Sequence, residues 1–468
     1  MTKPVASQAL SSLVLALTLL VVGSSLWGFW RFQQGQLLSD FGAFYCAGRL
    51  AGQGLDPYRQ EPMYSCESEP ASPLLARATG HVTDPAPLPP YALALFVPLS
   101  RLPLEQAALL WTTLLAAAWT AIAFVLRALT GYRWGALLAA IAFAAMMSLS
   151  LGQIAPLAIA LICIAALLLE RGRAPWAGIA CAAATVEPHV ALPVCAAIFI
   201  AAPRSRFSII GGGLVLLALT MLFGFDRNVE YLRGALPAHA LSDVADVGQY
   251  SLTVLVHAMG FPDALAERAG SIWYAIAAIA GIATACALKR RGYSAAAIAL
   301  VPMAFAVFGG PYVHWNQVVG AIPAALLMLR AQPRAAALQV AAIVGLAIPW
   351  LYVVGWGFLI PGAAAIAGIL AWQLLEPPLC NEAVVVAATF CALLFVNHAL
   401  AHTGPAPPFV ANVPRDAWAD LSWGAYVRSR IPIGTGIYLW LHLPTWAALA
   451  ATIGVAVRAA TRRSAPTP

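Results

Sequence analysis

The sequence predicts an all-α polytopic membrane protein, and three observations carry that prediction. Of its 468 residues, 61% are hydrophobic and only 10% are charged, whereas soluble domains carry about 25% charged residues. The mean hydropathy is +0.80. Apolar runs that approach the roughly 20 residues needed for a membrane-spanning helix recur along the chain. These observations exclude a soluble enzyme and a disordered chain. The net charge of +7 is scattered between the apolar runs, so nucleic acid is not expected as a partner.

We expect a bundle of about 12–14 transmembrane helices, with interfacial helices in the loops. The first run, 10–30, is not followed by a small-residue cleavage site, so it is expected to remain as an anchor. The other predicted spans lie near 104–126, 132–150, 154–170, 174–187, 188–203, 207–225, 271–288, 294–309, 315–329, 335–354, 357–375, 384–403 and 442–460. The two runs that meet at Glu187 are short for spans.

The basic residues predict the orientation, because they concentrate on the cytoplasmic side of membrane proteins. With both termini inside, the inner connections hold 15 of the 26 basic residues but only three of the 19 acidic ones. Three outer segments are then long: 31–103, 226–270 and 404–441. Function is expected on this outer face. The alanine-rich, arginine-over-lysine composition points to a high-GC bacterium, whose inner membrane would place this face in the periplasm.

The first outer segment begins with LLSDFGAFYCAGRLAGQGLDPY. Its apolar residues recur at helical spacing, which predicts an interfacial helix with an apolar face toward lipid. Asp40 begins this helix, either as an N-cap or as a carboxylate held at the membrane surface. Cys46 and Cys66 are the two cysteines of this segment. An oxidising compartment would permit a bridge between them, and the sequence leaves open whether it forms.

Proline breaks the apolar stretch TDPAPLPPYALALFVPLSRLP, residues 83–103, which is too short to span the membrane. It is expected to be a re-entrant or interfacial element. Irregular backbone at membrane depth is tolerated only where it is buried in protein or lines a cavity. A cavity near the outer leaflet is therefore predicted.

Five motifs in order resemble glycosyltransferase family 87. They are D-F-x-x-F/Y-x-x-A-G-R with a later D-P-Y, then PLPPYALALFVPLSRLP, GQIAPLAIALICIAALLLERGR, AATVEPHVALP and GGPYVHWNQVVGAIPAALLML. The resemblance covers about residues 10–330 and implies a GT-C-like transmembrane catalytic module over 1–330. Residues 331–468 then form a C-terminal group of helices. Family members are membrane enzymes that use polyprenyl-phosphate sugars, typically the mannose form.

The resemblance implies that Asp40 is the catalytic base, because it stands at the position of the family's catalytic aspartate. One base and one displacement would invert the anomeric centre. The donor would be a polyprenyl-phosphate sugar, the acceptor a glycolipid or glycan, and membrane lipids would surround the protein. The runner-up interpretation is a transporter or flippase for a lipid or amphiphile, which should place ionisable residues in the middle of its spans.

Six polar residues at outer helix ends or loops are expected to bind substrate: Arg49, Gln153, Glu187, His189, His314 and Asn316. His314 is the favoured phosphate or sugar contact, against an interfacial histidine beside Trp315. Gln153 and His189 are alternatively polar groups at helix ends. Arg49 alternatively meets lipid phosphates. The segment DVADVGQYSLTVLVHAMG also resembles a family region and is expected to cover the acceptor.

Glu187 departs from the family, which usually has lysine before this proline. If that lysine contacts the donor phosphate in relatives, the charge is reversed here, and His189 or a loop arginine would substitute. Glu187 is alternatively a second acid, an acceptor contact or a structural partner of Arg49. No metal-ligand spacing such as C-x-x-C or H-E-x-x-H occurs, and Asp40 has no second acid beside it in the sequence. We therefore predict no cofactor and no metal.

Overall fold

The computed structural model describes residues 38–68, 83–355, 359–375, 414–430 and 435–462. The predicted spans 10–30 and 384–403 lie outside the described residues. Helices make up the described part of the chain, and the β-structure found there consists of two isolated bridges, Arg59 with Trp418 and Gln249 with His314. The all-α class is confirmed.

Five helices of the described part are long and apolar enough to cross a membrane. They are α6 Leu104–Thr130, α7 Trp134–Leu151, α11 Arg206–Met221 with the turn before it, α15 Asp263–Arg290 and α24 Thr435–Thr461. Shorter apolar helices follow the other predicted runs: α8 Ala155–Glu170, α9 Ala174–Ala183, α10 Pro188–Ala201, α16 Ala297–Gly309, α18 Ile322–Ala331, α19 Ala336–Ala347 and α21 Ile360–Leu374. An integral multi-pass membrane protein is confirmed, while the total of 12–14 spans and the GT-C-like arrangement stay predictions.

The short pair of runs around Glu187 forms a helical hairpin. A 3-10 turn, Ala184–Val186, ends α9, and α10 begins at Pro188. Proline suits the first turn of a helix because its missing N–H has no partner there. Glu187 therefore lies in the non-helical turn between two apolar helices.

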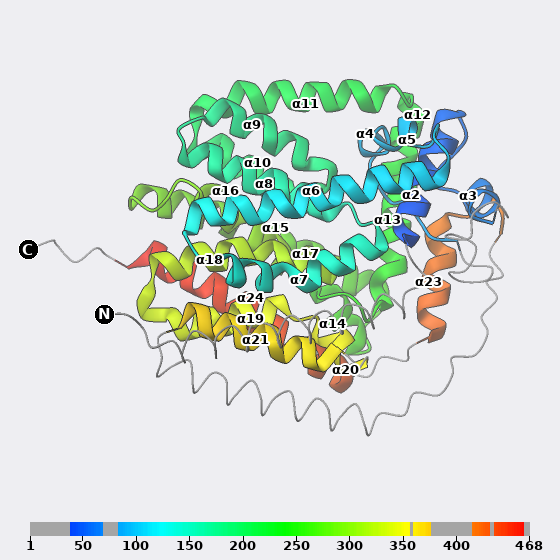
Figure 1. The fold of residues 1–468 in the computed structure, drawn as a ribbon. Coiled ribbons are helices and arrows are strands. Elements are labelled where there is room, and N and C mark those ends of the chain that lie inside the picture. Colours follow the sequence, from blue (N-terminus) through cyan, green and yellow to red (C-terminus); the bar gives the residue numbers. More distant parts are fainter. Residues whose placement is uncertain (1–37, 69–82, 356–358, 376–413, 431–434, 463–468) are drawn as a thin grey trace, which may run out of the picture.

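Short helices gather at one end of the bundle (Figure 1). They come from the three segments predicted to be long outer loops and from the turn before α18. Their bounds are α2 Ser39–Gly52, α3 Gln60–Glu67, α4 Pro90–Leu93, α5 Phe96–Leu99, α12 Phe225–Glu230, α13 Leu236–Ser242, α14 Leu252–Ala258, α17 Trp315–Val318 and α23 Ala419–Arg430. As predicted, α4 and α5 are too short to span.

The prediction that α2 turns its apolar face to lipid is wrong. Phe41 and Phe44 are buried inside the protein, where their rings lie 6.0 Å from that of Trp111 and 5.1 Å from that of Phe96, respectively. Gly48 permits this approach, since a Cβ there would lie 2.6 Å from the backbone of Phe96. The sequence shows an apolar face but not what covers it, and here α5 and α6 cover it.

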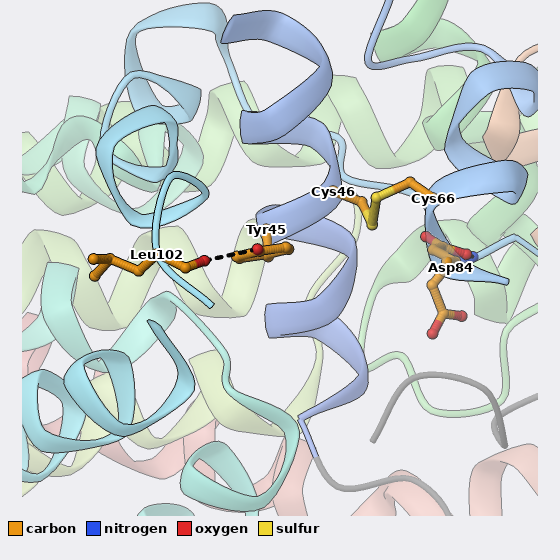
Figure 2. Close-up of a disulfide and its surroundings, with 6 residues drawn as sticks. Tyr45, Cys46, Cys66, Asp84 and Leu102 are labelled. Carbon is orange, nitrogen blue, oxygen red and sulfur yellow. Dashed lines mark hydrogen bonds between the residues drawn. A yellow bond between two sulfur atoms is a disulfide. The ribbon is translucent and has the colours of Figure 1, made fainter. Parts of the chain in front are cut away.

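A disulfide between Cys46 and Cys66 fastens α2 to α3 (Figure 2). On the other side of α2, the Tyr45 hydroxyl donates to the Leu102 carbonyl over 2.9 Å. The bridge that the sequence left open is therefore present. Together the two contacts fix α2, and with it Asp40, against the rest of the protein.

Two hydrophobic clusters form the core of the described residues. The smaller one lies beneath the short helices and includes Phe41, Phe96 and Trp111. The larger one runs through the bundle and includes residues on both sides of position 330, such as Leu326 and Leu346. The core is thus shared across the predicted division of the chain at 330, and that division stays a prediction.

Candidate functional site

Asp40 lies in the first turn of α2, and its carboxylate is held at both oxygens. The Ser39 hydroxyl donates to Oδ1 over 3.0 Å, and Gln153 Nε2 donates to Oδ2. The N-cap interpretation of Asp40 is wrong, because α2 begins one residue earlier and Leu38 occupies the cap position without a side-chain hydrogen bond. The carboxylate is therefore not used to cap the helix.

Gln153 reaches Asp40 from the turn between α7 and α8. Gly152 in this turn has a φ of 75° and lies so close to α2 that a Cβ would come within 2.5 Å of the Phe41 Cβ. Trp111 Nε1 donates to the Gly152 carbonyl over 2.8 Å. The Leu38 N–H donates to the Ser150 carbonyl. These contacts seat the turn directly against the start of α2.

His314, just before α17, faces three carboxylates. Its Nε2 lies 3.6 Å from Asp243 Oδ2, and its Nδ1 lies 3.8 Å from Asp246 Oδ2. Burial alone lowers the pKa of His314, but the nearby Asp243 carboxylate and the charges of Asp246 and Asp40 raise it to about 9. The imidazole is therefore positively charged at neutral pH. Its side chain is 37% exposed, which leaves it accessible to a ligand.

The carboxyl of Asp84 lies within the electrostatic reach of Asp40. Burial raises the pKa of Asp40 to about 6, while the Ser39 hydrogen bond and the charge of His314 act in the opposite direction. Burial and then the charge of Asp40 raise the pKa of Asp84 to about 7. Figure 2 shows Asp84 close to Cys66, and its N–H donates to Glu67 Oε2 over 3.0 Å.

Asp40 has no second acid beside it in the sequence, but the fold brings a distant one near it. Asp84 is 44 positions along the chain, on the segment that leads into α4, where the charge of Asp40 acts on it. Even so, the described residues contain no group of three or more His, Cys, Asp or Glu side chains arranged to hold a metal ion. Independence from metals and cofactors stays a prediction.

Glu187 contacts the same region from the hairpin turn. It is buried, its Oε2 lies 3.6 Å from His189 Nδ1, and it hydrogen-bonds with Gln317 and interacts electrostatically with His314. Gln317 Oε1 also accepts from the His314 N–H over 2.8 Å. The acid that replaces the family's lysine therefore lies against His189 and Gln317, within the electrostatic reach of His314.

Asn316 and Arg49 complete the set of predicted binding residues. Asn316 is buried on α17, and its Oδ1 has no hydrogen-bond partner within the described residues. Arg49 is in the last turn of α2, nine residues after Asp40 and so about 13 Å away along the helix axis. Gln153 thus contacts Asp40, and Glu187 and His189 lie within the electrostatic reach of His314, while Arg49 stands at the far end of α2.

Sequence reasoning missed five residues of this cluster: Asp84, His239, Asp243, Asp246 and Asp420. His239, on α13, has Nδ1 2.9 Å from Asp420 Oδ1 and Nε2 3.3 Å from Asp243 Oδ2. Two carboxylates within the sequence DVAD, in a segment already noted for its family resemblance, were an available signal for Asp243 and Asp246. No local signal marks Asp420, which lies in the C-terminal third of the chain.

The segment after η5 (Asp243–Ala245) holds His314 in place through its backbone. Gln249 Oε1 accepts from the Val313 N–H over 3.1 Å, and the Tyr250 N–H donates to the Val313 carbonyl over 2.7 Å. Ser251 caps α14, and His257 pairs with Asp263 at 3.0 Å. This segment therefore supports the site, and its predicted contact with the acceptor stays a prediction.

The fold and this cluster define an integral membrane protein with a buried site of carboxyls and histidines at one end of its helical bundle. Residues 88–311 match the model of glycosyltransferase family 87. The resemblance found in the sequence is thereby confirmed, and the match supports a glycosyltransferase. No curated protein and no solved structure matches the chain. Gln153, Glu187 and His189 lie inside the matched residues, whereas Asp40, His314 and Asn316 lie outside them.

Proposed function

We propose that the protein transfers a sugar, with mannose the expected one, from a polyprenyl-phosphate donor to a hydroxyl group of a glycolipid or glycan. The reaction would take place at the end of the bundle that carries Asp40. The distribution of basic residues supports placing this end outside the cytoplasm, in the periplasm of a bacterium. The single observation that carries the proposal is the Asp40 carboxylate, held by Ser39 and Gln153 and electrostatically coupled to a charged His314.

Asp40 would act as the general base. The acceptor hydroxyl gives its proton to the carboxylate as its oxygen forms a bond to the anomeric carbon. The bond between that carbon and the phosphate oxygen breaks, and its electron pair leaves with the polyprenyl phosphate. A pKa of about 6 keeps Asp40 ionised at neutral pH and strong enough as a base to help, since catalytic bases work best near the operating pH. One displacement inverts the anomeric centre.

The leaving group needs positive charge rather than a proton, because a phosphate ester is already stable as an anion. His314 would supply that charge at the donor phosphate. Glu187 stands where relatives have lysine, so it would not bind the phosphate. We assign Glu187, with His189, to the sugar or acceptor hydroxyls, and the unpaired Oδ1 of Asn316 to a sugar hydroxyl. Arg49, at the far end of α2, would meet the lipid-linked phosphate only outside the Asp40 cluster.

Transfer by purified protein in lipid would test this function. The donor is synthetic polyprenyl-phosphate mannose, native lipids supply the acceptor, and the release of polyprenyl phosphate is followed. We expect release by the natural protein and its loss in Asp40→Ala. If Asp40→Ala still releases polyprenyl phosphate, the protein is still a transferase, but Asp40 is not the base. No release across a panel of polyprenyl-phosphate sugars would contradict the proposal and favour a transporter or flippase.

A further inference from the structure

His239 lies between two carboxylates in the described structure. Its Nδ1 is 2.9 Å from Asp420 Oδ1, and its Nε2 is 3.3 Å from Asp243 Oδ2. The same Asp243 oxygen lies 3.6 Å from His314 Nε2. The four side chains therefore form one line in which acid and histidine alternate, ending at the half-exposed His314. All of them are largely buried except His314.

Asp420 enters this line from outside the family match. It is on α23, and the start of this helix pairs with the backbone after α2: the Ala419 N–H donates to the Tyr58 carbonyl, and the Gln60 N–H donates to the Ala417 carbonyl. The Arg59 guanidinium lies 3.6 Å from the centre of the Trp418 ring. These contacts dock α23 on the site, so its position next to His239 does not depend on one hydrogen bond.

A second C-terminal contact reaches the same region. On α24 the Tyr438 hydroxyl donates to the carbonyls of Gln249 over 2.8 Å and Ser251 over 3.1 Å. Trp446 Nε1 donates to the Tyr250 carbonyl over 3.0 Å. The part of the chain beyond the family match therefore supports both Asp243 and the segment that holds His314.

The surroundings of His239 favour its doubly protonated form. Each ring nitrogen faces a carboxylate oxygen, and each can donate only if it carries a hydrogen. Burial lowers the pKa of His239, but the charge of Asp243 and the hydrogen bond and charge of Asp420 raise it above its ordinary value. The charged or titratable groups that face it are Asp243, Asp420, His314, Asp246, Glu187, His189 and Tyr312.

We infer that Asp420 is a positioning residue of the donor site, where it holds His239 as an imidazolium whose charge offsets that of Asp243 behind His314. The inference rests on the proposed function, because the ligand it concerns is the donor phosphate. Without the charge of His239, His314 alone balances the charge of the Asp243 carboxylate, which leaves less positive charge to attract the phosphate. Asp420 itself touches neither substrate nor reacting atoms.

Binding of a donor mimic tests this role independently of the sugar. The probe is a short-chain polyprenyl methyl phosphate, a diester whose single charge is constant across the pH range used. Its dissociation constant is measured in lipid nanodiscs from about pH 5.5 to 8.5 for the natural protein, Asp420→Asn and the control Asp416→Asn. Asp416 lies in the same segment and is exposed. Dividing the dissociation constant of each variant by that of the natural protein at the same pH removes the effect of titrating groups that all three proteins share.

We expect Asp420→Asn to bind about tenfold more weakly at pH 8, the scale of one charge interaction at an effective dielectric constant of about 20. Removing Asp420 lowers the pKa of His239, so His239 becomes neutral there and regains its proton on acidification. The ratio should therefore return toward one near pH 5.5. His239→Gln should bind the probe weakly at every pH, since glutamine cannot be charged. This variant still tests the inference if Asp420→Asn folds poorly. Asp416→Asn should match the natural protein.

Two results for the ratio of the Asp420→Asn dissociation constant to the natural one would overturn the inference: a ratio of one at every pH, or a ratio raised equally at every pH. Neither result would depend on the charge of His239. In both cases the natural protein still binds the probe, and the proposed function stands. If the natural protein does not bind the probe at any pH, the proposed polyprenyl-phosphate donor is wrong, and the inference fails with it.

Discussion

Gln153 donates a hydrogen bond from Nε2 to Oδ2 of Asp40 and so joins the turn before α8 to the first turn of α2. Ser39 occupies the other carboxylate oxygen. The two donors fix the plane of the carboxylate, because each oxygen has a partner in a defined direction. Each oxygen keeps a second lone pair, which is the one available to accept a proton from a substrate.

Gln153→Leu should lower kcat for transfer about tenfold or more and change the donor KM little. A hydrogen bond to a charged group contributes about 1.5–3 kcal/mol, and its loss leaves the Asp40 carboxylate free to turn. Initial rates over a range of donor concentrations measure both constants. Gln106→Leu, at an exposed position on α6, is the matched control. A raised KM with an unchanged kcat would instead show that Gln153 binds the sugar.

The dependence of kcat/KM on pH should be bell-shaped, with limbs near pH 6 and pH 9. Asp40 is needed as the carboxylate, and its pKa is raised to about 6, so activity falls as pH drops below that value. His314 is needed as the cation, and its pKa is raised to about 9, so activity falls as pH rises above it. Rates in buffers of constant ionic strength provide the profile. An acid limb below about pH 4.5, near the ordinary value for aspartate, would contradict this assignment of the base.

His314→Gln should shift the acid limb of that profile to higher pH. The charge of His314 lowers the pKa of Asp40. A neutral side chain at position 314 therefore raises that pKa, and Asp40 becomes protonated at a higher pH. The alkaline limb should disappear, and donor affinity should fall. His257→Gln, which changes a histidine paired with Asp263 on α15, is the control. An acid limb that stays in place in His314→Gln would show that the two groups are not coupled.

The sequence was sufficient to predict most of the fold, because membrane-spanning helices are set by local composition. The runs at 104–126 and 154–170 became α6 and α8 with ends shifted by a few residues. Contacts between distant segments are a different matter. The apolar face of α2 is visible in the sequence, but its coverage by Phe96 and Trp111 depends on how α5 and α6 return to it.

The site was predictable only where a residue stood in a family motif or interrupted an apolar run. Gln153, Glu187 and His314 were found that way. Asp84 and Asp420 lie in the long segments predicted to be outside the membrane, where acids usually face water, so nothing nearby distinguishes them. Their importance comes from burial and from partners far along the chain: Asp40 for Asp84 and His239 for Asp420.

The double substitution Cys46→Ala, Cys66→Ala should destabilise the short-helix end of the protein. The bridge joins residues 20 positions apart, and closing a loop of that length contributes about 3 kcal/mol. Because α2 carries Asp40, activity should be lost at a lower temperature than in the natural protein. Thermal inactivation measures this, and reductant should lower the midpoint of the natural protein only. Cys286→Ala, at a half-buried free thiol on α15, is the control. An unchanged midpoint would mean that α2 is held without the bridge.

Gly152→Ala should reduce both stability and transfer, because it acts at the contact between Gln153 and α2. Gly152 has a φ of 75°, and a Cβ there would lie 2.5 Å from that of Phe41, the residue next to Asp40. Gly131→Ala is a close control, since Gly131 also ends a helix with a φ of 73° but has nothing within 4 Å of its added Cβ. Both variants should be destabilised by about 1–2 kcal/mol, because alanine replaces glycine in a left-handed backbone conformation. Only Gly152→Ala should also lower kcat, by displacing Asp40 from Gln153. Equal melting temperatures and equal kcat in the two variants would show that the α7–α8 turn does not press on the start of α2.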